Sequence, residues 1–271
     1  MKAVRISCLA ALLGIYACAI GAGVLTRGGY AQQDREHAGE RPGAVHWLGT
    51  DDLGRDRLVR LLYGARTSLV LAPAAALLAT ALATAIGSAA ALMGGGVERA
   101  ALYLTDVVSS TPWFFALLMV RAVLPLNVDP ALSVAITFAI LGLLGWPQGV
   151  RPMAARSGAM IHSEFLQQAR AAGIGPMRLL ARHLAPNLAP VAAAHFWATL
   201  PVFILAEANL SLLGLGVAEP LPSLGNLMTE IRDFQNVAQH PWLLAPALLL
   251  VAVMGALQAI SQPVRSSYDC T

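Results

Sequence analysis

The sequence predicts an all-α integral membrane protein with six transmembrane helices. Of its 271 residues, 57% are hydrophobic and 12% are charged, and the mean hydropathy is +0.63. Soluble globular domains carry about 25% charged residues, twice the share found here. Long apolar blocks separated by short polar segments are typical of a chain that crosses a bilayer repeatedly.

Six stretches are apolar and long enough to cross about 30 Å of hydrocarbon at about 1.5 Å of rise per residue. They lie at 7–26, 68–93, 100–126, 131–150, 188–214 and 242–262. Six crossings return the chain to the side on which it began. The predicted organisation is an N-terminal helix with an external amphipathic segment (1–67), a transmembrane core (68–262) and a tail (263–271).

The first stretch follows a basic start, Met1 to Arg5, and ends in small residues, which is also the pattern of a cleaved signal peptide. Its apolar run is longer than the core of a usual signal peptide, and this length favours an uncleaved helix. In both cases the following residues are exported. Lysine and arginine are divided almost evenly between the loops of the two sides, so the positive-inside rule gives little guidance. The basic N-terminus and the acid-poor central loop favour cytoplasmic termini.

The central loop, 151–186, contains a polar hairpin between the fourth and fifth spans. Ser163 can cap a helix that starts at Glu164, and Gly173 can take the left-handed conformation that ends it. A second helix is expected to start at Pro176, since proline is tolerated at the first helical position. We expect Pro186 to stop this second helix just before the fifth span.

An amphipathic loop that lies on lipid headgroups would have a similar outline. The polar faces, however, carry the uncharged Gln167 and Gln168 beside Arg170. This mixture suits contact with a protein better than contact with anionic lipid. The sequence therefore favours the hairpin as a docking element.

Three spaced motifs carry a resemblance to a known family. QQARAAG (167–173) and RHLAPN (182–187) lie in the hairpin, HWLGTDDLGRD (46–56) precedes the second span, and LAEANLSLLGLGV (205–217) with PSLGN (222–226) ends the fifth. Together they resemble the permease subunits of ABC importers in the peptide and nickel transport family. The resemblance covers about residues 40 to 260 and implies an EAA loop, whose coupling helix sits in a groove of a cytoplasmic ATPase.

The resemblance assigns roles to individual positions. Coupling to the ATPase is expected at Gln167, Gln168, Ala169, Arg170, Gly173, Arg182 and Pro186. The external signature is expected to consist of Gly49, Asp51, Asp52, Gly54, Arg55 and Asp56. Asp106, Glu207, Asn209 and Ser211 are expected in the translocation pathway or at a subunit interface. Gln167 stands where the family has a glutamate, and the tail lacks the family's closing pattern.

The family also implies the rest of the assembly. We expect a second homologous permease in a heterodimer, two cytoplasmic ABC ATPases and an extracytoplasmic substrate-binding protein, in a bacterial inner membrane and without nucleic acid. Lys2 is the only lysine of the sequence, so the chain has no phosphate-binding Gly-x-x-x-x-Gly-Lys loop. We therefore expect no cofactor on this chain, with ATP and Mg²⁺ used by the partner. Peptides are the expected cargo, with nickel or another small solute as the next candidate.

Ionisable residues inside spans are costly and mark candidate sites. Asp106 and Arg121 are too far apart along one helix to pair, so we expect Arg121 to extend outward and Asp106 to face a partner or cap a helix contact. His195 is expected to be a hydrogen-bonded packing residue. An ion-coupled secondary transporter that uses Asp106 and Glu207 is the alternative function, whereas the hydrolase motifs Gly-x-Ser-x-Gly and His-Glu-x-x-His do not occur.

Two adjacent carboxylates, Asp51 and Asp52, admit two interpretations. They are candidates for a metal site, but carboxylates among arginines more often form a structural charge network. The sequence favours the network, and no metal site is predicted.

Overall fold

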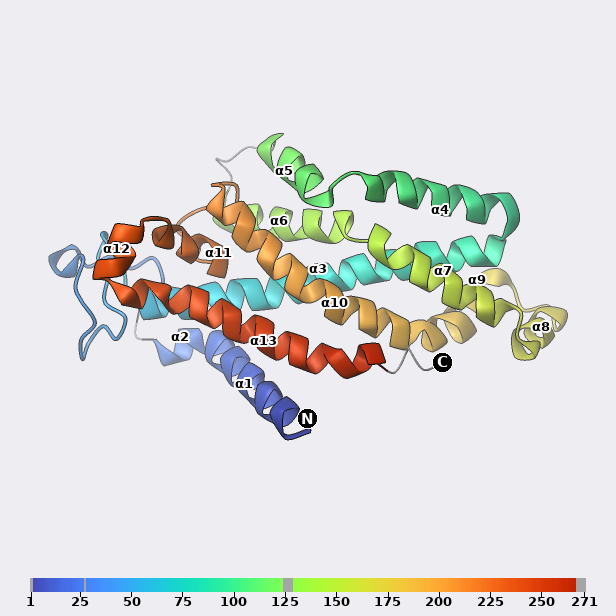
Figure 1. The fold of residues 1–271 in the computed structure, drawn as a ribbon, viewed down its shortest axis with the longest axis horizontal. Helices are drawn as coiled ribbons and strands as arrows, with labels where there is room; N and C mark the ends of the chain where they lie inside the picture. The colour runs from blue at the N-terminus through green and yellow to red at the C-terminus, as the bar shows by residue number, and fades with distance from the viewer. Residues whose placement is uncertain (1, 27, 124–128, 267–271) are drawn as a thin grey trace. The chain divides into compact units, whose positions relative to one another are not determined.

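The computed structural model describes residues 2–26, 28–123 and 129–266, and these are mostly helical (Figure 1). Within these ranges there is no strand, and the one β pairing is an isolated bridge between Thr50 and Asp56. The prediction of an all-α chain is therefore confirmed. The helices are α1 (Lys2–Ile20), α2 (Ala22–Leu25), η1 (Arg35–His37), α3 (Arg57–Met93), α4 (Gly95–Ser110), α5 (Trp113–Val123), α6 (Pro130–Leu144), α7 (Pro147–Ile161), α8 (Glu164–Ala171), α9 (Pro176–Leu179), η2 (Leu180–Leu184), α10 (Ala185–Leu212), α11 (Leu224–Leu227), η3 (Met228–Arg232), α12 (Phe234–Gln239), η4 (Pro241–Leu244) and α13 (Ala245–Ser266).

Three stretches of helix are long and apolar enough to cross a membrane by themselves. They are Arg57–Met93, Arg182–Leu212 and Pro241–Ser261. Two bent pairs, α4 with α5 and α6 with α7, raise the count to five if each pair is one span. The remaining apolar helix, Ile6–Ile20, is shorter. By length and composition, the described residues thus supply three to five spans.

The bends lie where proline interrupts the backbone. α4 and α5 meet at 74° across Thr111 and Pro112, and Thr111 is extended, with ψ of 125°. A residue before proline avoids the helical region because the ring clashes with its backbone and Cβ. α6 and α7 meet at 42°, and Pro147 opens α7. Each predicted span at 100–126 and 131–150 is therefore a pair of helices, and part of the first lies in 124–128, outside the described residues.

Two sequence-based expectations about helix ends are wrong. The second span, predicted from residue 68, does not begin its helix there, because α3 runs unbroken from Arg57 to Met93 over 37 residues and includes the end of the amphipathic segment. α7 continues to Ile161 and so occupies the start of the predicted loop 151–186. In both cases helical propensity carries the backbone past the end of the apolar run, which is all that a hydropathy boundary detects.

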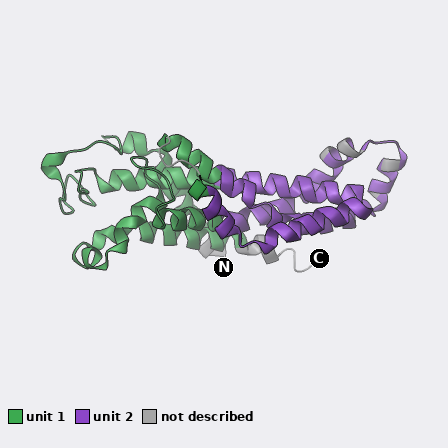
Figure 2. Cartoon of the chain, turned by 90° about the horizontal axis from the view of Figure 1, so that it is seen from above, with its two compact units in different colours: residues 1–72, 121–138, 201–262 green, residues 73–120, 139–200, 263–271 purple. Residues whose placement is uncertain are grey.

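The chain divides into two compact units (Figure 2). Unit 1 contains residues 1–72, 121–138 and 201–262, and unit 2 contains residues 73–120, 139–200 and 263–271. Unit 2 is held by close helix packing: a Cβ added at Gly87 of α3 would lie 2.7 Å from Cβ of Met153 on α7. In the same unit His195 lies 3.0 Å from the Thr80 hydroxyl through Nδ1, which confirms the expected packing role.

Candidate functional site

The central hairpin lies in unit 2 and has the predicted outline. α8 begins at Glu164, α9 begins at Pro176, and between them Gly173 has a φ of 78°. A residue with a side chain rarely adopts this left-handed backbone, whereas glycine does so without a Cβ clash. The turn is closed by the N–H of Ile174, which donates to the carbonyl of Ala169 at 3.2 Å.

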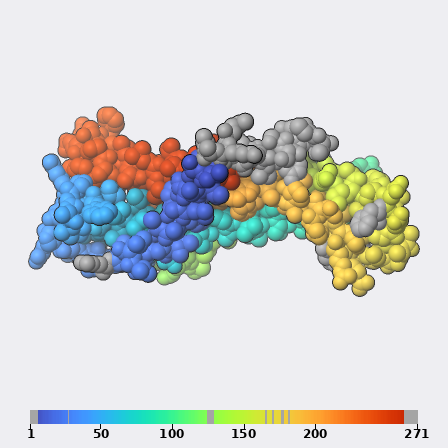
Figure 3. Space-filling view, turned by 90° about the horizontal axis from the view of Figure 1, so that it is seen from below, coloured from blue at the N-terminus to red at the C-terminus, as the bar shows by residue number. Residues whose placement is uncertain are grey.

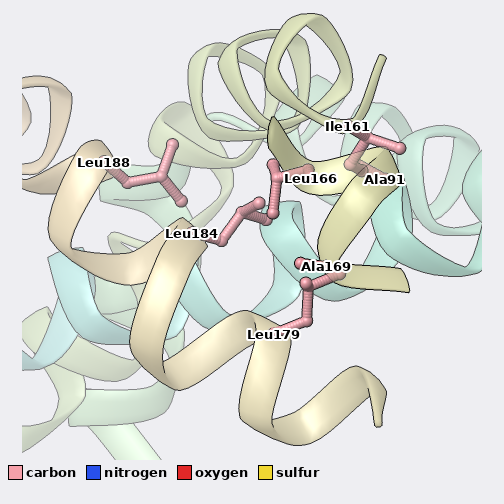
Figure 4. Close-up of a cluster of buried hydrophobic side chains, with 7 residues drawn as sticks. All are labelled: Ala91, Ile161, Leu166, Ala169, Leu179, Leu184 and Leu188. Atoms are coloured by element: carbon pink, nitrogen blue, oxygen red, sulfur yellow. The ribbon is translucent and has the colours of Figure 1, made fainter. Parts of the chain in front are cut away.

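A small hydrophobic core holds the hairpin together (Figure 4). Leu166 of α8 and Leu184 of η2 point toward each other in this view, and both are at most 1% exposed. The cluster consists of Ala91, Ile161, Leu166, Ala169, Leu179, Leu184 and Leu188. Because Ala91 belongs to α3 and Ile161 to α7, the hairpin is packed onto the ends of two longer helices of its unit.

The predicted coupling residues divide between this core and the surface. Ala169 faces the core, and the side chain of Arg170 lies outside the described residues. The exposed members are Gln167, Gln168, Gly173, Arg182 and Pro186. Figure 3 shows the hairpin surface, in yellow, gathered at one end of unit 2. A solvent-exposed polar face on a packed hairpin is a suitable docking surface.

Pro186 does not stop the second helix, contrary to the prediction. It lies inside α10, and the residues before it form the π-helical turn η2, in which the N–H of Ala185 donates to the carbonyl of Leu180. The wider π turn changes the bonding just before proline, which has no N–H to offer and crowds the carbonyl four residues earlier. The second arm of the hairpin and α10 therefore form one helical run.

The signature loop, residues 46–56, lies in unit 1 and is shaped by its predicted members. Gly49 and Gly54 have φ of 71° and 74°. The Asp51 carboxylate accepts from the backbone N–H of Leu53 at 3.0 Å and of Arg55 at 2.8 Å, and from Arg55 Nε at 2.6 Å. The charge-network interpretation is thus confirmed for Asp51. Asp52, by contrast, is exposed.

Asp56 fixes the start of α3. Its Oδ1 accepts from the N–H of Val59 at 3.0 Å, the bonding of an N-cap residue, and its Oδ2 lies 2.7 Å from His46 Nδ1. The signature therefore has a structural function that the sequence motif does not reveal. It folds the loop tightly and starts a long membrane helix.

Ion pairs join the signature loop and the start of α3 to the connection between α10 and α12 (residues 213–233). Glu219 accepts from Arg55 Nη1 at 2.9 Å and from Arg60 Nη2 at 2.8 Å, and Glu230 pairs with Arg57. Burial would lower the pKa of Arg55, but the bonds and charges of Asp51 and Glu219 raise it above its ordinary value. Sequence reasoning missed both glutamates, because their partners lie more than 150 residues away.

A cavity of about 1030 Å³ opens between these two segments of unit 1. One wall is formed by residues 51–57 of the signature loop and α3, and the other by residues 229–236 of η3 and α12. Figures 1 and 3 both show the loop, in light blue, beside the orange-red α11 to α12 region. Side chains of both charges line it, among them Asp52, Arg232 and Asp233. The cavity is open to the surface of unit 1.

Glu207 lies in the interior of unit 1 with a side chain that is fully buried. Its Oε1 accepts from the hydroxyls of Ser211 at 2.9 Å and Ser223 at 2.7 Å, and its Oε2 accepts from Ser68 at 3.3 Å. The structure thus joins Glu207 and Ser211, two of the predicted pathway or interface residues. Asn209 is exposed on the same helix.

Of the other two ionisable groups in the spans, Arg121 lies elsewhere than expected, whereas the expectation for Asp106 stays a prediction. Asp106 of α4 pairs with Arg151 of α7 through both carboxylate oxygens, and both side chains are about half exposed. Arg121 is 1% exposed and does not extend outward: Nε donates to the carbonyl of Leu215 at 2.9 Å, and Nη2 donates to the Ser133 hydroxyl at 2.7 Å. Its guanidinium binds backbone carbonyls just beyond the end of α10, a partner that hydropathy cannot predict.

The described residues form an all-helical fold with three to five candidate spans and an exposed, packed hairpin just before one of them, which is the architecture of an integral membrane protein. Residues 61–264 match the family described as binding-protein-dependent transport system inner membrane component, and the chain belongs to this family. It is 30% identical to the oligopeptide transport system permease protein OppC of Escherichia coli K12 over 225 residues, which are 83% of this chain and 72% of that protein. The OppC of Mycobacterium tuberculosis is 28% identical over 265 residues, 97% of this chain and 89% of the relative.

Proposed function

We propose that this chain is the membrane-spanning subunit of an ATP-driven peptide importer, forms half of the translocation pathway, and is coupled to a separate ATPase through the α8–α9 hairpin. The exposed polar face of a hairpin with its own hydrophobic core is the observation that carries this proposal. A compact hairpin can transmit a displacement to α10, because η2 and α10 form one helical run. A loose loop resting on lipid would absorb the displacement instead.

The proposed topology has six spans and cytoplasmic termini. The three long helical stretches and two bent pairs supply five crossings, and α1 with α2 supplies the sixth. In this arrangement the hairpin lies in the cytoplasm, and the signature loop with its cavity lies outside.

The proposed partners follow from this arrangement. Two cytoplasmic ABC ATPases bind ATP and Mg²⁺ and contact the hairpin, a second related permease completes the pathway, and a substrate-binding protein delivers cargo from outside. Relatives named for oligopeptide transport support peptides as the cargo. Nickel remains the second candidate cargo.

The alternative, ion-coupled transport through Asp106 and Glu207, has less support. Asp106 is engaged by Arg151, and Glu207 by three serine hydroxyls of its own chain. Both carboxylates are thus already bonded to donors of this chain, and neither site shows a contact that would favour binding of a transported ion.

The test is purification of the tagged chain from membranes in mild detergent, with co-purifying proteins identified by mass spectrometry. Gly173→Val places a β-branched residue at a φ of 78°, and nothing lies within 4 Å of its Cβ position. Strain of about 1–3 kcal/mol should open the turn and reduce recovery of the ATPase about tenfold, while the second permease is retained.

Gly39→Val is the matched control. Gly39 has a φ of 71°, and its Cβ position is equally open, but it lies in the loop before the signature. Full recovery of the ATPase with Gly173→Val would rule out the hairpin as the docking element. A wild-type chain that purifies without an ATPase would favour the ion-coupled alternative.

A further inference from the structure

The α10–α12 connection has little regular structure, but it packs tightly against the unit 1 parts of two long helices, α3 and α10. Its short helix α11 lies so close to α10 that a Cβ on Gly225 would be 2.7 Å from Cα of Ala208. A Cβ on Gly64 of α3 would be 3.1 Å from the carbonyl carbon of Ser223. Because both contacts involve backbone, α11 cannot shift without losing its fit to α3 and α10.

Glu207 is the polar centre of this contact between α11, α3 and α10. Ser68 comes from α3, Ser211 from α10, and Ser223 is the N-cap residue of α11, so one carboxylate joins three elements. Removing this acceptor leaves hydroxyls of all three elements without their common partner.

Two of the serines also hold the backbone of α11. Ser68 Oγ accepts from the N–H of Leu224 at 3.1 Å, and Ser223 Oγ accepts from the N–H of Asn226 at 3.0 Å. Each hydroxyl therefore receives a backbone N–H and donates its own hydrogen to Glu207. These bonds orient both hydroxyls. The Glu207 carboxylate therefore helps to hold the backbone of α11 in place through the two serines.

The residues directly after α11 form one wall of the cavity. Thr229 and Glu230 belong to η3, which begins where α11 ends, and residues 232–236 continue the wall into α12. The opposite wall starts at the signature loop and includes Arg57, which pairs with Glu230. A shift of α11 must therefore move one wall of the cavity against the other.

We propose that Glu207 is a positioning residue that sets the shape of this cavity through α11, and that the cavity is where the extracytoplasmic binding protein engages this subunit. The proposal rests on the proposed function, which supplies that partner. The mixed charge of the walls suits a protein surface that carries groups of both signs. Glu207 acts on this contact from inside the subunit and does not touch the partner.

The experiment uses the complete complex in proteoliposomes, with peptide uptake measured at increasing concentrations of binding protein. Glu207→Gln keeps the size of the side chain but replaces an oxygen acceptor with an N–H₂ donor. We expect the KM for the binding protein to rise about tenfold, the loss expected when a buried hydrogen bond is removed, while kcat changes less than twofold. Ser68→Ala, which removes one of the three hydroxyls, should shift KM in the same direction by a smaller factor.

Ser88→Ala is the matched control. Ser88 is buried in α3, the helix that also carries Ser68, but its hydroxyl bonds only to carbonyls of α3. Its loss should therefore leave KM unchanged. A fall in kcat at unchanged KM with Glu207→Gln would overturn the proposal and place Glu207 in the pathway. If Glu207→Gln does not assemble, an unchanged KM with Ser68→Ala overturns the proposal, and a raised KM supports it. Absence of ATP-dependent uptake in the wild-type complex would instead count against the proposed function.

Discussion

At the scale of single residues, Gln167 joins two neighbouring helices. The motif resemblance leads us to expect a glutamate at this position, whereas the Nε2 of Gln167 donates to the carbonyl of His162, just beyond the end of α7, at 3.2 Å. An ionised glutamate cannot donate this bond and would bring negative charge against a carbonyl oxygen. The amide thus ties the start of α8 to the end of α7.

This bond leads to a prediction about the hairpin. Gln167→Glu should raise hydrogen exchange of the α8 amides about threefold, because an exposed hydrogen bond of about 0.7 kcal/mol is lost. Exchange measured by mass spectrometry on the detergent-solubilised chain provides the test. Gln168→Glu is the control, since Gln168 is also exposed and occupies the next position of α8. Equal exchange in the two variants would show that the Gln167 bond does not hold the hairpin.

Arg121 and Glu207 show which residue roles the sequence could not reveal. The sequence marks both as candidate sites, because charges are rare in spans. Their partners are carbonyls of Leu215 and Gly216 for Arg121, and the serines of three elements for Glu207. Those contacts form between segments up to 139 residues apart, and only the tertiary fold brings them together.

At the scale of helices, the sequence predicts those helix starts and turns that depend on the backbone chemistry of a few neighbouring residues. The start of α8 at Glu164, the left-handed Gly173 and the start of α9 at Pro176 follow from rules that act within a few residues. α3 starts at Arg57, before the apolar stretch predicted from residue 68, because helix formation continues wherever the backbone bonds are satisfied. Pro186 failed as a stop signal because a π turn accommodates it.

The pairing of α3 with η3 gives a prediction at this scale. Arg57 and Glu230 are partly buried, with 18% and 33% of their side chains exposed, and they join the two walls of the cavity. Charge reversal of either residue should destabilise the chain, whereas Arg57→Glu with Glu230→Arg should recover about 1 kcal/mol of coupling energy. Thermal unfolding of the four proteins in detergent measures this coupling. Additive losses would mean that the two walls are not joined by this pair.

At the scale of the whole molecule, two loops lie on opposite sides of the membrane when an odd number of crossings separates them, and on the same side when the number is even. Between Ala44 and Ala172 lie α3 and the two bent pairs, which make three crossings if each pair is one span. An odd number places these exposed alanines on opposite sides of the membrane. If the bent pairs are re-entrant, only α3 crosses and the two residues still lie on opposite sides, whereas a single re-entrant pair would place them on the same side.

The N-terminus separates the remaining topologies. The apolar helix Ile6–Ile20 rises only roughly 22 Å, short of the hydrocarbon thickness, so a crossing needs α2 as well. In intact cells that carry a chain with Cys8, Cys18 and Cys270 replaced, a membrane-impermeant maleimide should label Ala44→Cys, whereas Ala172→Cys and Ala3→Cys should react only after permeabilisation. Labelling of Ala3→Cys from outside would show that the first helix does not cross and that the chain has five spans, with the hairpin still cytoplasmic. Labelling of Ala172→Cys from outside would remove the hairpin from the ATPase and, with it, the proposed coupling.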